Sequence, residues 1–403
     1  MTAKSSRREI LSLFFPIYLP AFLFAFSQSL LLPVLPLYAQ SFNIPYALVG
    51  LVLAGDAIGM IAGDLPAGML MRRIGQKRAM SAGLLLTGLS TAGLFFAPGV
   101  AWVVALRALA GVGVALFAVS RHYFLTEMAP PASRGRIISL FGGLFRLGRT
   151  LGPVVGGGMA VLFGLRASFL LFGAICLVAL LIVIFLLPNL EVAADSDVEM
   201  VVSPFTHFWR MLREQRRVIA TAGLGFLFMQ LVRSGPTVII PLYGANVLGL
   251  DVQTIGIVLS VSAALDMALF YPAGIIMDRH GRRHTIIPSA LALSVGLAIL
   301  PFTYNLVTLL LAGMLLGLGN GLGSGAMITT GADLAPKRGR SEFLGAWNLV
   351  GDIGATGGPL AVGALADVMP LASTGWIIAL AGVGAAFMFG VMVGETKKRP
   401  EQL

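Results

Sequence analysis

The sequence predicts an all-α membrane protein with twelve transmembrane helices, arranged as two parallel six-helix repeats. Three observations predict this fold class. The composition is 57% apolar and 11% charged, whereas soluble domains hold about 45–50% and about 25%, so a water-soluble globule could not bury this much apolar surface. Apolar runs long enough to cross a bilayer recur along the chain, and short motifs recur about half a chain length apart.

Crossing the hydrocarbon requires about 20 mostly apolar residues, and twelve segments meet this requirement. The first follows Arg7 and Arg8, but it is longer than the apolar part of a secretory signal, about 7–15 residues, and is predicted to be a membrane helix. Glycine accounts for 50 of the 403 residues, which fits helices that approach closely through small residues. The predicted spans are 11–37, 47–71, 79–97, 101–122, 137–162, 168–188, 218–243, 254–277, 285–303, 306–331, 343–365 and 374–394.

The polar segment 189–217 divides the spans into an N-terminal half, 1–188, and a C-terminal half, 218–403. Its second part has the pattern of an amphipathic surface helix, so we predict a cytoplasmic linker. Nearly all Lys and Arg residues lie at the two termini and in alternate loops. Because loops rich in Lys and Arg lie on the cytoplasmic side, we predict that both termini are cytoplasmic in the cell inner (plasma) membrane. The net charge of +10 is thereby explained without nucleic acid.

The two halves repeat one another at an offset of 205 or 206 residues. Parallel repeats of this kind place a substrate site near the middle of the membrane, at the interface of the halves. The matching segments are Pro36-Leu-Tyr38 with Pro241-Leu-Tyr243, Gly111-x-Gly113 with Gly317-x-Gly319, Glu127-Met-Ala-Pro130 with Asp333-Leu-Ala-Pro336, and Gly152-Pro153 with Gly358-Pro359.

A short basic turn is also repeated. It reads Gly274-x-x-x-Asp278-Arg279-x-Gly281-Arg282-Arg283 in the second half and Gly68-x-x-x-Arg72-Arg73-x-Gly75 in the first. Glycine at its centre allows a backbone turn that is closed to other residues. The acid of the second copy can interact with the positive end of a helix dipole or with arginines, whereas the first copy has an arginine in its place.

These motifs resemble those of the major facilitator superfamily, and the resemblance covers nearly the whole chain. The basic turn looks like that family's signature between the second and third helices of each half. Arg107-x-x-x-Gly111-x-Gly113 looks like its fourth-helix motif, and Gly148-x-x-x-Gly152-Pro153-x-x-Gly156-Gly157 looks like the fifth-helix motif of its drug–proton antiporters. The glycine face of that motif permits close helix packing, and the resemblance implies that it seals against leak. Packing without that function is the alternative.

The resemblance implies a conformational gate at the turns, closed in the outward-open state. Arg72 should make the first copy weak or rewired, with Glu342 as a compensating partner; alternatively, Arg72 only contributes to topology and points to water. The predicted gate residues are Gly68, Arg72, Arg73, Gly75, Gly274, Asp278, Arg279, Gly281, Arg282 and Glu342.

Charged side chains inside the membrane are costly, so they are candidates for function. Helix depth suggests that Asp56 can pair with Arg107, and the resemblance implies proton coupling for the latter. It also implies that Asp64 faces Asp352 and that Asp266 faces Arg146 or Arg149 across the central cavity. Buried structural pairs are the alternative. The predicted translocation residues are Gln28, Asp56, Asp64, Arg107, Arg146, Arg149, Arg233, Asp266, Asn320, Asn348 and Asp352.

The sequence therefore predicts a secondary transporter that works by alternating access, with proton-coupled antiport of a hydrophobic or amphipathic small molecule as the leading function. Acids in a low-dielectric cavity suit proton coupling. A carrier of an organic anion or lysolipid, using the intramembrane arginines, is the alternative. A non-transporting receptor is a third reading, which the lack of an appended signalling domain argues against. No nucleotide-binding, metal or catalytic motif is present, so we predict no cofactor, no metal and no enzyme activity, and a monomer.

Overall fold

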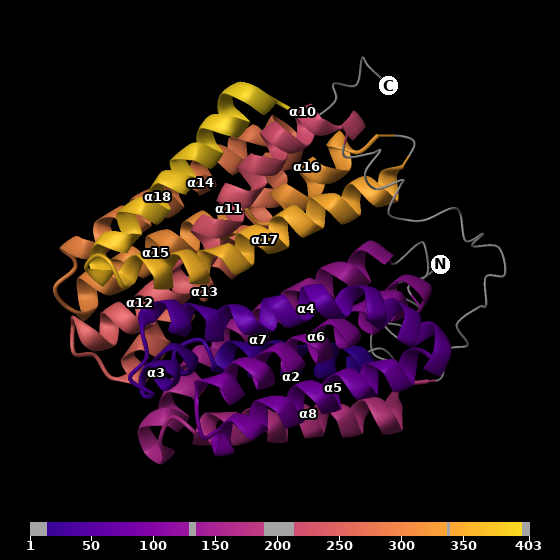
Figure 1. Ribbon diagram of the computed structural model, residues 1–403. Helices are drawn as coiled ribbons and strands as arrows, with labels where there is room; N and C mark the ends of the chain where they lie inside the picture. Colours follow the sequence, from indigo (N-terminus) through magenta and orange to yellow (C-terminus); the bar gives the residue numbers. More distant parts are fainter. Residues whose placement is uncertain (1–13, 129–133, 189–212, 337–338, 397–403) are drawn as a thin grey trace. The chain divides into compact units, whose positions relative to one another are not determined.

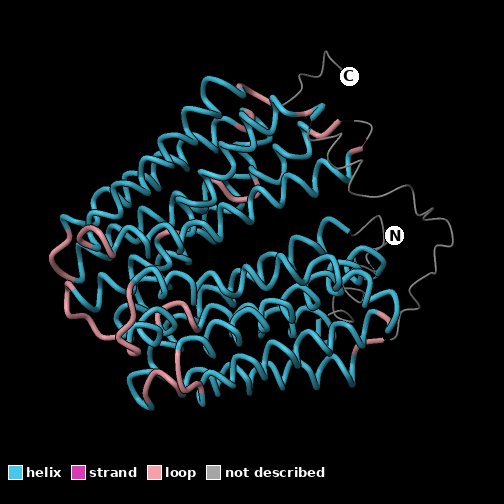
Figure 2. The backbone as a smooth tube through the Cα atoms, in the orientation of Figure 1, coloured by secondary structure: helices cyan, strands magenta, loops and turns pink. Residues whose placement is uncertain are grey.

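The computed structural model describes residues 14–128, 134–188, 213–336 and 339–396. Throughout these residues the chain is built from helices joined by short loops, and they contain no strand (Figure 2). The all-α membrane fold predicted from composition is confirmed. The contacts divide the chain into two compact units, which are coloured mainly indigo to magenta and orange to yellow in Figure 1. Unit 1 comprises residues 1–194 and 244–260, and unit 2 comprises residues 195–243 and 261–403.

Unit 1 is a bundle in which α6 packs against both α4 and α5, α2 packs against α7 and α8, and α8 also packs against α5. The first span is broken between α2 and α3 at Pro33, because proline cannot supply a backbone N–H to continue the helix. The elements of the N-terminal half are η1 Phe14–Tyr18, α2 Leu19–Leu30, α3 Val34–Gln40, α4 Tyr46–Ile74, α5 Gln76–Gly93, η2 Leu94–Phe96, α6 Val100–Met128, α7 Arg134–Phe163 and α8 Ala167–Leu186.

Unit 2 repeats this packing: α14 packs against α15 and α18, and α11 packs against α17 and α18. These pairs correspond to α5 with α6 and α8, and to α2 with α7 and α8, so the duplication read from the sequence extends to helix packing. The elements of the C-terminal half are α10 Arg216–Val218, η3 Ile219–Gly223, α11 Leu224–Ser234, α12 Pro236–Asn246, α13 Val252–His280, α14 Arg283–Ile299, η4 Leu300–Phe302, α15 Leu306–Leu322, α16 Ala326–Leu334, α17 Arg340–Ala366, α18 Leu371–Phe387 and η5 Met388–Val393.

Within the described residues, 11 helices are long and apolar enough to cross a membrane, one fewer than predicted. The remaining predicted span, 137–162, is occupied by α7. This helix carries Arg146 and Arg149 among many glycines, which lowers its mean hydropathy below that of the other spans. The predicted linker, 189–217, lies almost entirely outside the described residues, and its amphipathic helix stays a prediction.

Candidate functional site

The centre of unit 1 contains an ion pair between α4 and α6. The Arg107 Nη2 atom lies 3.3 Å from Asp56 Oδ2, and the two side chains are only 7% and 25% exposed. The pairing expected from helix depth is therefore present. Neither partner is fully satisfied, because Asp56 Oδ1 and the Nε and Nη1 atoms of Arg107 are buried without a hydrogen-bond partner. Such a partly satisfied buried group costs free energy.

Glycines bring these two helices into backbone contact beside the pair. A Cβ atom added at Gly111 would collide with the backbone of Asp56, and one at Gly59 would lie 2.7 Å from the backbone carbon of Ala108. Close contact of this kind is what small residues permit in membrane helices. Gly111 of the fourth-helix motif and Gly59 of α4 thus allow the close approach that places the arginine opposite the acid. The equivalent positions in unit 2 are Ser262 and Gly313, so the pair is not duplicated.

In unit 2 the structure brings together two of the predicted cavity residues. Arg233 donates from Nε to Asn320 Oδ1 at 2.9 Å and from Nη2 to the backbone oxygen of Asn320 at 3.0 Å. Both side chains are half-buried. This contact joins α11 to α15 and was not foreseen as a pair.

The other predicted translocation residues differ in exposure within their own units. Gln28, Arg146, Asp266 and Asp352 are half-buried, and Asp64, Arg149 and Asn348 are exposed. The expected approaches of Asp64 to Asp352 and of Asp266 to Arg146 or Arg149 join residues of different units and stay predictions.

The glycine face of α7 packs on α2, as its four-residue spacing suggests. Added Cβ atoms would lie 2.7 Å from the Phe22 oxygen at Gly148 and 2.5 Å from the Phe26 oxygen at Gly152. One at Gly156 would collide with the Leu30 backbone. Ser29 adds a hydrogen bond between α2 and α7 by donating from Oγ to the Gly148 oxygen at 3.2 Å. The face is thus a tight helix contact, and its role in sealing stays a prediction.

Its place in the motif predicts that Gly157 widens this face, but Gly157 lies on another side of α7. A Cβ atom there would meet the backbone of Val252 and Gln253, at the start of α13 and within unit 1. Next to it, the Val154 N–H donates to Ser260 Oγ at 3.2 Å, and Pro153 lies under Gly256.

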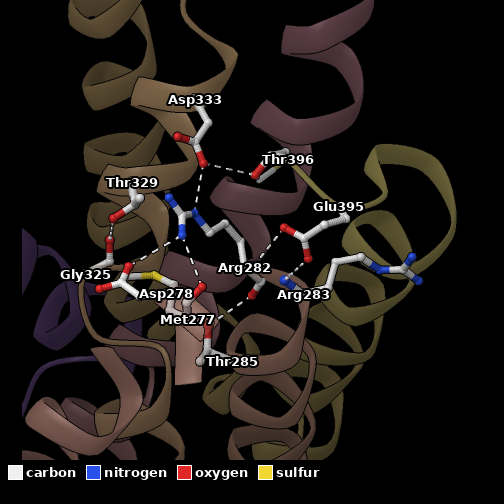
Figure 3. Close-up of polar contacts among 10 residues, drawn as sticks. All are labelled: Met277, Asp278, Arg282, Arg283, Thr285, Gly325, Thr329, Asp333, Glu395 and Thr396. Atoms are coloured by element: carbon white, nitrogen blue, oxygen red, sulfur yellow. Dashed lines mark hydrogen bonds and ion pairs between the residues drawn. The ribbon is translucent and has the colours of Figure 1, made fainter. Parts of the chain in front are cut away.

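The basic turn of unit 2 is held by a charged cluster (Figure 3). Arg282 donates from Nε to Asp333 Oδ2 at 2.8 Å, and its Nη1 lies 3.6 Å from Asp278 Oδ1. Nη1 also donates to the Met277 oxygen at 3.1 Å. The Arg282 and Asp333 side chains are 13% and 23% exposed, whereas that of Asp278 is 76% exposed. Within unit 2, the strongest partner of the arginine is therefore an acid on α16 and not the acid of the motif.

Glu395 completes this cluster from the far end of the sequence. Its two carboxylate oxygens accept hydrogen bonds from the backbone N–H groups of Arg282, at 2.9 Å, and Arg283, at 3.2 Å. These groups begin α14, where unpaired N–H groups and the helix dipole favour a negative charge. Gly281 has φ +106° and lies against this carboxylate, so closely that a Cβ atom would collide with it. Thr396 Oγ1 also donates to Asp333, at 3.4 Å.

The turn of unit 1 follows the same backbone path with different side chains. Gly75 has φ +87°, and the residue equivalent to Arg282 is Gln76, which is fully buried. Gln76 donates from Nε2 to the Ser120 oxygen at 3.4 Å, and its Oε1 is buried without a hydrogen-bond partner. Arg72 is exposed, as in the reading that assigns it to topology alone.

Sequence reasoning missed three residues that the structure singles out: Asp333, Glu395 and Arg121. Asp333 could have been found, because it was already matched to Glu127 in the repeat. Glu395 carried no signal, since it lies beyond the last span. Arg121 stands at the end of the predicted span 101–122, where a charge is typical of a loop, but it lies inside α6 and is 9% exposed. Within the described part of the chain, no group of three or more His, Cys, Asp or Glu residues could hold a metal ion.

Comparisons with known proteins agree with this geometry. The family model described as Major Facilitator Superfamily matches residues 17–270 and 222–403. The chain is similar to the multi-drug resistance efflux pump PmrA homolog of Lactococcus lactis, with 24% identity over 361 residues and 84% of each chain. It is also similar to the 4-hydroxybenzoate transporter PcaK of Pseudomonas aeruginosa, with 31% identity over 157 residues, 39% of this chain and 35% of that one. The solved nucleoside transporter NupG shares the fold, with a TM-score of 0.77, 15% identity, and 96% of this chain and 100% of its own covered.

Proposed function

The chain belongs to the major facilitator superfamily and is a multi-pass membrane transporter of small molecules, not an enzyme; on this premise we propose that it exports a hydrophobic or amphipathic compound in exchange for protons. The observation that carries the proposal is the Asp56–Arg107 pair. Its buried atoms keep unused hydrogen-bonding capacity on both partners. A carboxylate that can exchange its arginine partner for a proton, when a conformational change separates the two, is what proton coupling requires.

The proposal includes the organisation of the transporter. Residues 1–188 and 218–403 are the two halves of an alternating-access carrier, joined by a cytoplasmic linker at 189–217. Both termini face the cytoplasm in the cell inner (plasma) membrane, and the protein acts as a monomer. The turns around Gly75 and Gly281 are the conformational gates, and the glycine face of α7 limits leak. A relative named as a multi-drug resistance efflux pump supports the direction and the type of substrate.

The experiment measures export of ethidium, as the probe, from proteoliposomes with an imposed pH gradient. We expect the gradient to drive ethidium export by the wild-type protein. We expect it to have no effect on export by the variants Asp56→Asn and Arg107→Gln. The double variant Asp56→Asn/Arg107→Gln is the decisive control. If the pair only stabilises the fold, removing both charges restores thermal stability and coupling together. If the pair couples protons, stability recovers and coupling does not. Wild-type export that ignored the gradient would refute proton coupling.

A second function is favoured by a separate observation. Arg146 and Arg149 lie three residues apart on α7, where side chains share a face, and they are half-buried and exposed, respectively. Such a basic face within the predicted span suits an organic anion or a lysolipid, and one relative is named as a 4-hydroxybenzoate transporter. Under this alternative, Arg146→Gln and Arg149→Gln should abolish binding of an anionic probe, and undiminished binding would exclude it.

A further inference from the structure

Arg121 is a buried arginine that neither of these functions uses. It lies seven residues before the end of α6, inside the membrane span Val100–Leu125, and is 9% exposed. An arginine inside a membrane span is costly. The fold itself does not require this charge, because the equivalent residue of unit 2, at the offset of 206, is Met327, which is also buried.

Three phenyl rings surround the guanidinium group. Its carbon lies 5.4 Å from the ring centroid of Phe117, one turn earlier on α6. It lies 5.0 Å from that of Phe141 and 5.3 Å from that of Phe145, both on α7. The latter two rings stack on each other, with centroids 6.1 Å apart and planes at 26°. Cations are attracted to ring faces at these distances, so the rings hold the guanidinium in a fixed place between the two helices.

The rings supply no hydrogen-bond acceptor of the kind that an arginine needs. Within the described residues the guanidinium makes no hydrogen bond and no ion pair, and its Nε atom is enclosed without a partner. Two other arginines of the described membrane spans are different: the buried Arg107 pairs with Asp56, and the half-buried Arg233 bonds to Asn320. Arginine side chains only donate hydrogen bonds, and their fork matches a carboxylate. What the site lacks is an anion.

We propose that Arg121, Phe117, Phe141 and Phe145 form a binding site for the acidic group of an aromatic acid. The carboxylate of the ligand accepts hydrogen bonds from the guanidinium, and its ring packs against the phenyl side chains. This inference rests on the proposed transport function and adds aromatic acids to the amphipathic compounds that the transporter binds. Charge-assisted hydrogen bonds in a site of low dielectric supply both affinity and selection for the charge.

The experiment measures binding of three probes of similar size to the purified full-length protein in phosphatidylcholine nanodiscs: benzoate, benzyl alcohol and benzylammonium. We expect benzoate to bind most tightly. Arg121→Met should weaken benzoate binding about tenfold or more and leave benzyl alcohol unchanged. This substitution installs the residue that the other repeat buries at the same place, so we expect the variant to fold. Arg121→Lys should keep part of the affinity, because it retains the charge without the fork.

Arg166→Gln is the matched control. Arg166 also lies over an aromatic ring of unit 1, 5.9 Å from the centroid of Tyr38, and bonds to the Phe95 oxygen at 3.3 Å. Its removal takes the same charge from the same unit and should not change benzoate binding. Equal benzoate affinity in the wild type and Arg121→Met would overturn the proposal. So would tighter binding of benzylammonium to Arg121→Met, since the rings would then be a cage for cations.

Two further measurements separate this site from its neighbours. Adding phosphatidylglycerol to the nanodiscs tests a lipid phosphate as the anion: unchanged benzoate affinity supports the proposal, and loss of benzoate binding overturns it. Binding is measured without a pH gradient, so failure of the Asp56–Arg107 transport experiment leaves this result intact. Should Arg121→Met fail to fold, Phe141→Leu, which removes one ring and keeps the charge, should weaken binding of benzoate, and no effect would overturn the proposal.

Discussion

The two basic turns of the repeat follow the same backbone path and differ in the side-chain contacts that hold it. Both contain a glycine at positive φ, Gly75 and Gly281. In unit 2 the next residue, Arg282, is bound to an acid on α16, and Glu395 binds the start of α14 (Figure 3). In unit 1 the next residue is a neutral glutamine that reaches only α6 and α5. The two repeats therefore share the path of the backbone at the turn, but charged hydrogen bonds hold this path in unit 2 and not in the described residues of unit 1.

This difference assigns separate physical tasks to the two turns. The unit 2 turn ties three segments together, α13–α14, α16 and residues 395–396, so moving any of them breaks charged contacts. In place of these charged contacts, the unit 1 turn has the Gln76 Oε1 atom, which is buried without a hydrogen-bond partner. The charges of this turn lie on exposed side chains such as Arg72. We expect the unit 2 turn to resist deformation and the unit 1 turn to yield. The predictions below test this contrast.

Arg282→Gln should have the largest effect, because it gives unit 2 the residue of unit 1. It leaves Asp333 largely buried, with Thr396 as its remaining hydrogen-bond donor. Breaking a buried charge pair by removing one partner costs about 3–5 kcal/mol, and the partial exposure of this pair lowers the expected loss to about 2–3 kcal/mol. The measurement is the free energy of unfolding in detergent. Arg78→Gln, which removes an exposed charge at the other turn, should change it by less than about 0.5 kcal/mol. Equal losses would refute the contrast.

Alanine at the two turn glycines should separate backbone strain from loss of contact. Both positions have positive φ, which costs a residue with a Cβ atom about 1–3 kcal/mol. Only at Gly281 does the new Cβ atom also displace Glu395, since nothing lies within 4 Å of the equivalent atom at Gly75. Gly281→Ala should therefore lower thermal stability more than Gly75→Ala. In a Glu395→Ala background the difference should vanish; if it persists, displacement of that carboxylate is not its cause.

The turns also show what the sequence could predict. Composition and spacing predicted the helices, the repeat and the two glycines, because periodicity and positive φ depend on local residues. The Asp56–Arg107 pair followed from helix depth, since both lie in long regular helices. Asp333 and Glu395 were missed because their roles depend on which helix ends meet in space. Arg121 was missed because a charge near the end of an apolar run reads as a loop residue until its aromatic neighbours on α7 are known.

Glu395→Gln should have a smaller effect on the same turn. The amide keeps one acceptor for the N–H groups that begin α14 but loses the negative charge that the helix dipole favours. Loss of such an interaction costs about 0.5–1 kcal/mol. Thermal unfolding with and without 0.5 M salt, about three times physiological ionic strength, measures it, and salt should reduce the difference between wild type and variant. Glu214→Gln, at an exposed acid of unit 2, is the control. A loss unaffected by salt would indicate packing instead of charge.

Asp251→Ala extends the contrast to the other end of α13 and should have the smallest effect. Asp251 caps this helix by accepting the Thr254 N–H at 2.8 Å, whereas its equivalent in the first repeat, Pro45, provides no side-chain cap. The hydrogen bond from the Thr254 backbone lowers the pKa of the Asp251 carboxyl below its ordinary value. Because the side chain is exposed, the variant should lose only about 0.5 kcal/mol at pH 7.

The pH dependence of that loss identifies its cause. A carboxyl group whose pKa is lower in the folded than in the unfolded state stabilises the fold fully above the unfolded value, about 3.9, and loses this contribution as pH falls through the folded value. The difference in thermal stability between wild type and Asp251→Ala should therefore be constant from pH 7 to about 5 and shrink below about 4. Asp251→Asn, which keeps an acceptor, should show a smaller loss at pH 7 with the same pH dependence, because the group that titrates is the wild-type carboxyl. A difference that stayed constant down to pH 3 would show that the loss does not come from the ionised carboxylate of Asp251.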